Sequence, residues 1–186
     1  MATTLDKLER VLANVLAMND EPRVAPGLER QQIVARLEHA SIPVTDELVA
    51  LYEWHNGIAN LNAFLFFYDL DFAITVYEGF RDHRSEVPEY GWEEGMFPVV
   101  TQNGDIYYYV DLETGSVFAG DPEGGTFRKM AAHYDHVLNA VLSAFDEKLV
   151  SYDELGGAIE IDYEDWQALG EHFEVSTEFT SSDIRY

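Results

Sequence analysis

The sequence has no cysteine among its 186 residues. This chain therefore cannot form a disulfide, supply a cysteine nucleophile or hold a cysteine-ligated zinc or iron–sulfur cluster. It also has no apolar run near the roughly 20 residues that a membrane-spanning helix needs. Its N-terminus lacks the basic and then apolar regions of a signal peptide. These absences are compatible with a reduced compartment, and we expect a cytoplasmic protein.

Basic residues are scarce. Eleven Lys and Arg oppose 35 Asp and Glu, which gives a formal net charge of −24. Residues 1–60 hold nine acids and five bases, residues 61–125 hold 13 and two, and residues 126–186 hold 13 and four. Such a charge repels nucleic acids and anionic membranes and attracts basic proteins. We expect no nucleic-acid or membrane partner. A partner that recognises the negative charge should bind the middle or C-terminal third of the chain. A protein that is merely acidic is the alternative.

Apolar residues are plentiful, at 47% of the chain with 13% aromatics, which is enough for a packed core. The length predicts one domain, which we place at residues 1–150. The acidic remainder, residues 151–186, is expected to be a C-terminal extension with one short helix from about Asp162 to Phe173.

Apolar residues at three- to four-residue spacing predict several helices. The first is capped by Thr4 and broken at Asn19, and the second spans about residues 28–40. Thr45 is expected to cap a third helix that Asn56 and Gly57 end. Residues 70–80 predict a short helix followed by a polar loop to residue 95, and residues 134–149 predict a long amphipathic helix.

The middle of the chain has the pattern of strands. An aromatic run at residues 64–68 and the segment 97–101 predict two strands, and Asn103-Gly104 predicts a tight hairpin turn. Residues 106–112 alternate strictly, and short turns separate them from the strands expected at 116–119 and 126–128. Connections this short join only antiparallel strands. The fold class is therefore α+β: N-terminal helices, a central antiparallel meander and a covering C-terminal helix.

Catalytic motifs are missing from the sequence. It has no phosphate-binding glycine loop, no GxGxxG and no Gly-x-Ser-x-Gly elbow. His133 and His136 could share a helix face and bind a metal, although we favour the simpler interpretation that they belong to the polar start of a helix. Close carboxylate pairs could act as acid and base, but with 35 acids such pairs arise by chance. We predict no catalytic residue, cofactor or metal.

One face of a central strand combines aromatic and acidic residues: Tyr107, Tyr109 and Asp111. If it is open, this face suits protein binding, because aromatic side chains anchor interfaces. The alternative is that a helix covers the rings. The expected partner-binding residues are acidic or aromatic and belong to the middle third: Asp69, Asp71, Glu93, Glu94, Asp105, Tyr107, Tyr109, Asp111 and Glu113.

Three blocks of residues, in this order and spacing, resemble the SMI1/KNR4 family, also called the SUKH superfamily. The matching residues are Ile42-Pro43, Leu48, Leu51-Tyr52 and Asn56-Gly57; Phe97-Pro98-Val99, Asn103-Gly104-Asp105 and Tyr107 to Asp111; and Gly115-Ser116-Val117-Phe118. The resemblance covers about residues 28–148. The chain departs from the family pattern in the helix before Ile42, where a frequent Glu is replaced by Val34-Ala35-Arg36, and after Val150.

The resemblance implies an α+β domain without catalytic activity. Bacterial members of the family are largely immunity proteins that neutralise toxins, often nucleases, delivered by neighbouring cells. Fungal members are regulatory scaffolds in cell-wall synthesis. The first hypothesis is therefore an immunity protein that blocks a basic toxin, and the acidic charge favours it independently. The alternatives are a regulatory interaction module and an acidic metal-dependent hydrolase.

Overall fold

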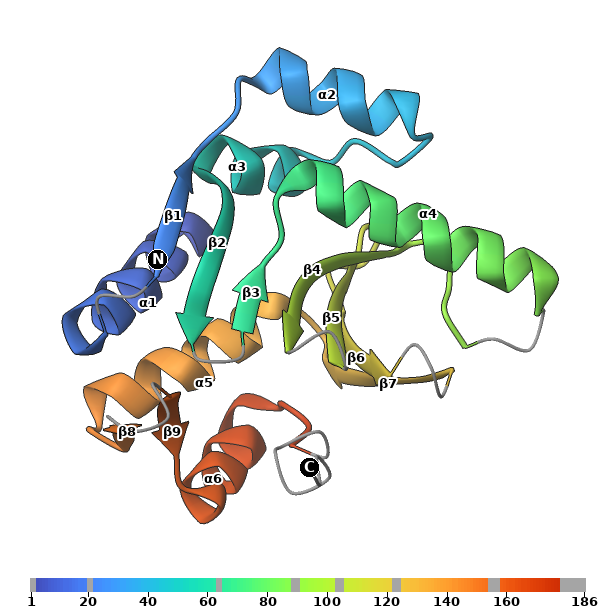
Figure 1. Cartoon of the computed structure of the whole chain (residues 1–186). Coiled ribbons are helices and arrows are strands. Elements are labelled where there is room, and N and C mark those ends of the chain that lie inside the picture. Colours follow the sequence, from blue (N-terminus) through green and yellow to red (C-terminus); the bar gives the residue numbers. More distant parts are fainter. Residues whose placement is uncertain are drawn as a thin grey trace.

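The computed structural model describes residues 3–19, 22–62, 65–87, 91–102, 106–121, 125–153 and 158–177. Helices cover both faces of a curved sheet (Figure 1). The elements are, in chain order, α1 (Thr4–Met18), β1 (Arg23–Pro26), α2 (Arg30–His39), α3 (Asp46–Trp54), β2 (His55–Asn62), β3 (Leu65–Phe67), α4 (Leu70–Glu86), β4 (Met96–Gln102), β5 (Ile106–Asp111), β6 (Val117–Asp121), β7 (Thr126–Ala131), α5 (Tyr134–Asp146), β8 (Val150–Asp153), β9 (Ala158–Ile161) and α6 (Tyr163–Phe173).

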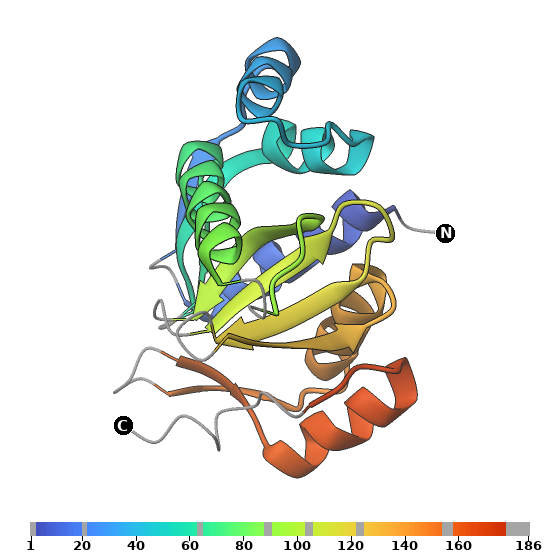
Figure 2. The same ribbon diagram turned by 90° about the vertical axis from the view of Figure 1, so that its right-hand side faces the viewer.

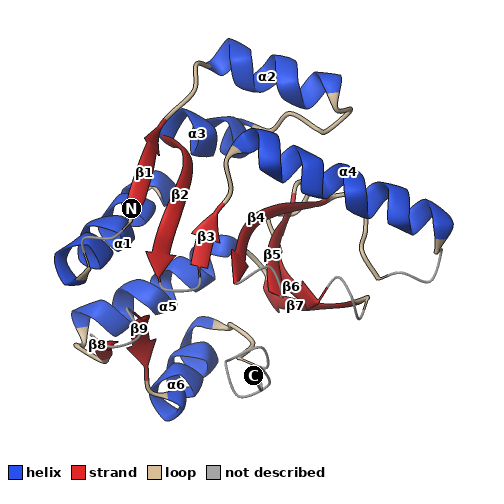
Figure 3. Cartoon of the chain, in the orientation of Figure 1, coloured by secondary structure: helices blue, strands red, loops and turns tan. Residues whose placement is uncertain are grey.

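The main sheet has seven strands, and their order in space is their order in the chain, from β1 to β7 (Figure 3). Every neighbouring pair is antiparallel. The α+β class and the expected meander of β4 to β7 are therefore confirmed. The Asn103-Gly104 turn between β4 and β5 lies outside the described residues.

Side-chain caps fix where the first helices begin. The cap of α1 is Thr3 and not Thr4: the Thr3 hydroxyl accepts from the Asp6 amide at 3.2 Å, and the Asp6 carboxylate accepts from the Thr3 amide at 2.7 Å. The expected cap of α3 is confirmed, because Thr45 Oγ1 accepts from the Leu48 amide at 3.1 Å.

Helix α4 is longer than expected. The sequence predicted a helix over 70–80 and a loop from residue 81, but α4 continues to Glu86. The second half is polar and lacks an apolar repeat. It is held by specific contacts instead: the Arg84 guanidinium donates to the Trp92 carbonyl, and Phe80 packs on the sheet.

The segment after α3 is a strand, which corrects a second expectation. Asn56 and Gly57 do not end the helix; α3 stops at Trp54, and β2 begins at His55. Gly57 has a φ of +96° inside this strand, and a Cβ there would lie 2.8 Å from the Asp69 amide nitrogen. Only glycine fits such a close approach with a positive φ. The Asn56 side chain accepts from the Leu70 amide at 2.9 Å, so the Asn-Gly pair joins β2 to the start of α4.

Two hydrophobic clusters lie on opposite faces of the sheet. The larger one includes buried residues of α2, α3 and α4, and the smaller one joins β5, β6 and β7 to α5 and α6 (Figure 2).

The C-terminal segment contains the short helix that was expected from about Asp162 to Phe173, which is α6, and a β8–β9 hairpin before it that was not expected. Leu169 and Val175 are buried in the smaller cluster, and the Ser176 amide donates to the Met130 carbonyl at 2.7 Å. Residues 158–177 thus pack on the rest of the molecule.

Candidate protein-binding surface

Helix α4 covers the aromatic face of β5. The Phe80 ring centroid is 5.6 Å from that of Tyr107 and 5.7 Å from that of Tyr109, both edge to face. Tyr109 is 0% exposed and Tyr107 is half-buried. The open-face interpretation is therefore wrong for Tyr109, because a covering helix has taken the position that a partner would need.

The acidic residues beside this face are exposed and held in place by α4. Glu93 and Glu94 follow the buried Trp92, whose indole N–H donates to the Met96 carbonyl at 3.0 Å. The Tyr77 hydroxyl of α4 donates to the Glu94 carbonyl at 2.5 Å. Two buried aromatic side chains thus fix the backbone of this segment while both carboxylates face solvent.

The end of β5 brings a second pair of acids to the same place. Asp111 pairs with Met96, and the Leu112 amide donates to the Gly95 carbonyl at 2.9 Å. A Cβ on Gly95 would lie 3.4 Å from Asp111 Oδ2. Glu113 follows in the exposed β5–β6 turn. We call the four residues Glu93, Glu94, Asp111 and Glu113 the β4–β5 acidic end.

Hydrogen bonds keep Asp111 ionised. Its Oδ1 accepts from the Thr114 amide at 2.7 Å, the Thr114 hydroxyl at 2.9 Å and the Glu113 amide at 3.0 Å. Burial raises the pKa of this carboxyl, but these donors and the nearby charge of Lys129 outweigh burial and hold the pKa below its ordinary value. Asp111 therefore has a structural task in the turn and contributes charge at the same time.

The remaining predicted residues do not join this group. Asp69 caps α4, where its Oδ1 accepts from the Phe72 amide at 3.0 Å. Asp71 pairs with the Arg36 guanidinium at 3.2 Å. Both carboxylates have partners within the chain, and Asp105 lies outside the described residues.

A second acidic region lies in the C-terminal segment and was missing from the predicted residues. Between Lys148 and Arg185 the sequence has no Lys or Arg. Helix α6 and its caps expose carboxylates there beside Tyr163, which is 49% exposed. The charge count of the last third was the signal, but no motif marked individual side chains. The exposed acids of this region are Glu160, Asp162, Glu164, Glu171 and Glu174.

Several of the few basic side chains form ion pairs with acidic side chains of the same chain. Arg30 pairs with Asp46 at 2.5 Å, Arg10 with Asp146 at 3.2 Å and Lys7 with Asp135 at 2.9 Å. These pairs join helices to one another in the N-terminal half and at α5. Arg30, Arg10 and Lys7 therefore pair with carboxylates of α3 and α5 and not with those of the β4–β5 acidic end.

The two histidines considered as metal ligands serve other contacts. His133 caps α5, with its Nδ1 accepting from the Asp135 amide at 3.2 Å, and His136 Nδ1 lies 2.9 Å from the Phe173 carbonyl. Among the described residues, no group of three or more His, Asp or Glu side chains is placed to hold a metal ion. Within the same ranges, no helix combines the length and the apolar character needed to cross a membrane.

No protein-family model matches the chain, and a search of curated proteins also finds no match.

Proposed function

We propose that this chain is a non-catalytic, cytoplasmic protein-binding domain of SMI1/KNR4 type, and that it acts as a bacterial immunity protein against a basic toxin such as a nuclease. The observation that supports the proposal most directly is the β4–β5 acidic end. The carboxylates of Glu93, Glu94 and Glu113 are exposed and that of Asp111 is half-buried, while the backbone that carries them is fixed by Trp92, Tyr77 and the hydrogen bonds of the Asp111 turn.

Electrostatics explains how such a surface would work. A nuclease binds phosphates in a basic cleft, and an acidic protein of net charge −24 is drawn to the same cleft. Complementary charge mainly speeds association and selects the partner. Because the backbone of this segment is already fixed, binding orders only the side chains, which favours tight association.

The test is co-expression with a toxin domain encoded beside this gene, together with binding of the two purified proteins at low and high salt. We expect neutralisation of the toxin, and association that slows as salt rises. A triple variant with Glu93, Glu94 and Glu113 changed to Gln should associate about tenfold more slowly at low salt.

The matched control removes the same charge from α2 and α3. Glu38, Glu47 and Glu53 are exposed there, and their triple change to Gln should alter association much less. A toxin that keeps full activity with this protein in excess would refute the immunity role. A non-toxic protein bound by the same surface would instead favour the regulatory module.

A further inference from the structure

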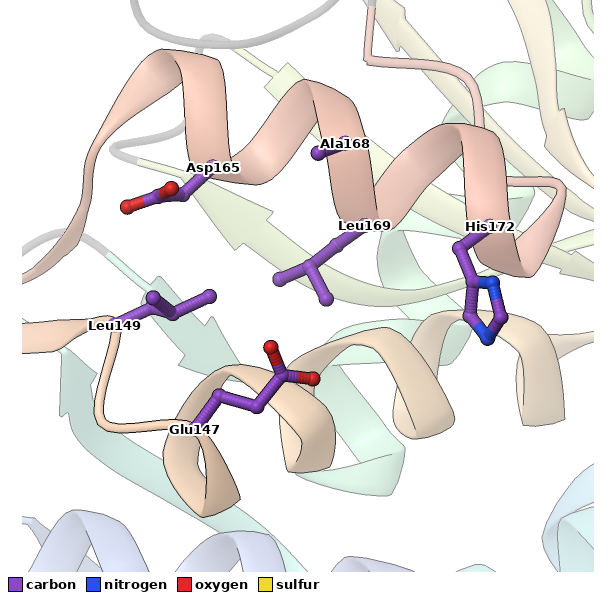
Figure 4. A pocket seen from close by; sticks show the side chains of 6 residues that line it. All are labelled: Glu147, Leu149, Asp165, Ala168, Leu169 and His172. Atoms are coloured by element: carbon purple, nitrogen blue, oxygen red, sulfur yellow. The ribbon is translucent and has the colours of Figure 1, made fainter.

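A hollow of about 330 Å³ opens between the end of α5 and helix α6 (Figure 4). Three apolar side chains and three polar ones line it: Leu149, Ala168, Leu169, Glu147, Asp165 and His172. In Figure 4 the side chains of Glu147, Leu149 and Leu169 converge on the space between the helices, while Asp165 and His172 flank it at its two ends. The hollow thus combines an apolar floor with carboxylates from two helices.

Local structure fixes both carboxylate-bearing segments. Glu147 is the C-cap of α5, and its Oε1 accepts from the Ser143 hydroxyl at 2.7 Å. The chain then reverses, with the Leu149 amide donating to the Ala144 carbonyl at 2.9 Å. Asp165 lies in the first turn of α6, one turn before the buried Leu169. The floor and the charged rim are therefore part of the α5–α6 packing.

We propose that this hollow binds the side chain of a lysine or arginine of the protein partner. The methylene stem would lie on Leu149, Ala168 and Leu169, and the cationic head group between the carboxylates of Glu147 and Asp165. The inference rests on the proposed function and deepens it, because it assigns one side-chain subsite to a partner of stated charge.

The chemistry of the lining favours this occupant. Long basic side chains have an apolar stem and a charged head, which matches an apolar floor with an acidic rim. A carboxylate near a guanidinium or ammonium group forms a charge-assisted hydrogen bond. The surrounding segment from residue 149 to 184 has no Lys or Arg to compete for these acids. Lys148, between Glu147 and Leu149, is exposed and does not line the hollow.

The test uses Nα-acetyl-arginine methylamide and the lysine equivalent as probes, titrated into the ¹⁵N-labelled full chain. We expect saturable shifts of the amide signals of Glu147, Leu149, Asp165 and Leu169. The citrulline analogue, which has the shape of arginine without its charge, should give at least tenfold weaker binding. Lys148→Gln, which removes a neighbouring positive charge, should tighten binding about twofold.

Variants with equal charge change separate this subsite from general attraction to an acidic protein. Glu147→Gln with Asp165→Asn should weaken probe binding at least fivefold. Glu164→Gln with Glu171→Gln, exposed on the same helix and outside the lining, should leave it within twofold. Equal weakening in both double variants, or shifts spread evenly over the acidic surface, would overturn the proposal.

The toxin assay distinguishes failure of the subsite from failure of the immunity role. If Glu147→Gln with Asp165→Asn neutralises the toxin as well as the natural chain does, the subsite is not used and the immunity role stands. If the probes bind the hollow but no toxin is neutralised, the subsite stands and the immunity role falls.

Discussion

Lys7 Nζ lies 2.9 Å from Asp135 Oδ2, and this ion pair joins the first helix to α5. The Thr4 hydroxyl donates to the other carboxylate oxygen at 2.8 Å. Burial raises the pKa of Asp135, but the donors Lys7 and Thr4 and the nearby His133 outweigh burial and hold the pKa below its ordinary value of 3.8. The attachment of α1 therefore depends on an ionised carboxylate.

Asp135→Asn should lower the free energy of unfolding by about 1 kcal/mol at pH 7, because a partly exposed ion pair and its hydrogen bond are weakened. A pKa that is lower in the folded state means that the unfolded chain binds the proton more readily. The contribution of Asp135 is therefore present above pH 4 and is lost as the pH falls below it. Urea unfolding at pH 7, 5 and 3 should show that the difference in the free energy of unfolding between the natural chain and the Asp135→Asn variant becomes smaller as the pH falls. A gap of constant size would contradict this account.

Gly115→Ala should destabilise the protein by roughly 1–3 kcal/mol. Gly115 has a φ of +71°, and a Cβ there would lie 2.7 Å from Cδ2 of His133, the cap of α5. The matched control is Gly79→Ala in α4, where a Cβ would meet nothing within 4 Å. That change should stabilise the helix by about 0.5–1 kcal/mol. Thermal unfolding followed by circular dichroism would measure both, and the same sign for the two variants would be inconsistent with the structure.

Phe80→Ala should cost about 2–4 kcal/mol, because its ring packs on Tyr107 and Tyr109 and holds α4 on the sheet. Phe72 is on the same helix but is 49% exposed, so Phe72→Ala should cost under about 1 kcal/mol. Denaturant unfolding gives both values. Near-ultraviolet circular dichroism of the Phe80 variant should also change, because the tyrosine rings lose their fixed neighbour. Equal costs for the two variants would show that α4 does not cover the sheet as described.

Leu169→Ala tests whether the C-terminal segment shares its stability with the rest of the chain. Leu169 is 5% exposed in the cluster between α6, α5 and the sheet, and we expect a loss of about 2–3 kcal/mol in the main unfolding transition. Leu16→Ala, at a side chain 42% exposed on α1, is the matched control and should cost well under 1 kcal/mol. If residues 151–186 form an independent appendage, the main transition will keep its midpoint in the Leu169 variant.

The sequence predicted the helices and strands that have a clear local pattern of apolar residues. The apolar repeats of α1, α2, α3, α5 and α6 follow from the burial of one helix face, whereas β5 alternates between two faces that are both covered. Strands β1 and β2 were missed for physical reasons. The first pairs on one side only and ends in Pro26, and the second is rich in Asn and has a positive φ at Gly57 and Asn60. Their pairing comes from tertiary contacts that no local pattern encodes.

The sequence predicted that the candidate surface is acidic, but not which residues form it. Composition pointed to the middle and last thirds of the chain, and the structure brings Glu93, Glu94, Asp111 and Glu113 together at one end of the sheet. Tyr109 looked equally suitable in the sequence, because alternation assigns a side chain to a face without saying what covers that face. The helix over residues 70–80 was predicted, but no local pattern showed that its Phe80 packs on Tyr109.

The strand order β1 to β7 has a consequence for synthesis of the chain on the ribosome. Each strand can pair with the one that emerged just before it, so the sheet can grow hairpin by hairpin without waiting for distant sequence. Helix α1 is the exception, since its partner α5 leaves the ribosome only after all seven strands. The first helix to be made thus completes its packing among the last, and an arrested nascent chain ending before residue 134 should lack the α1–α5 contacts and keep only the smaller ones with α3 and β2.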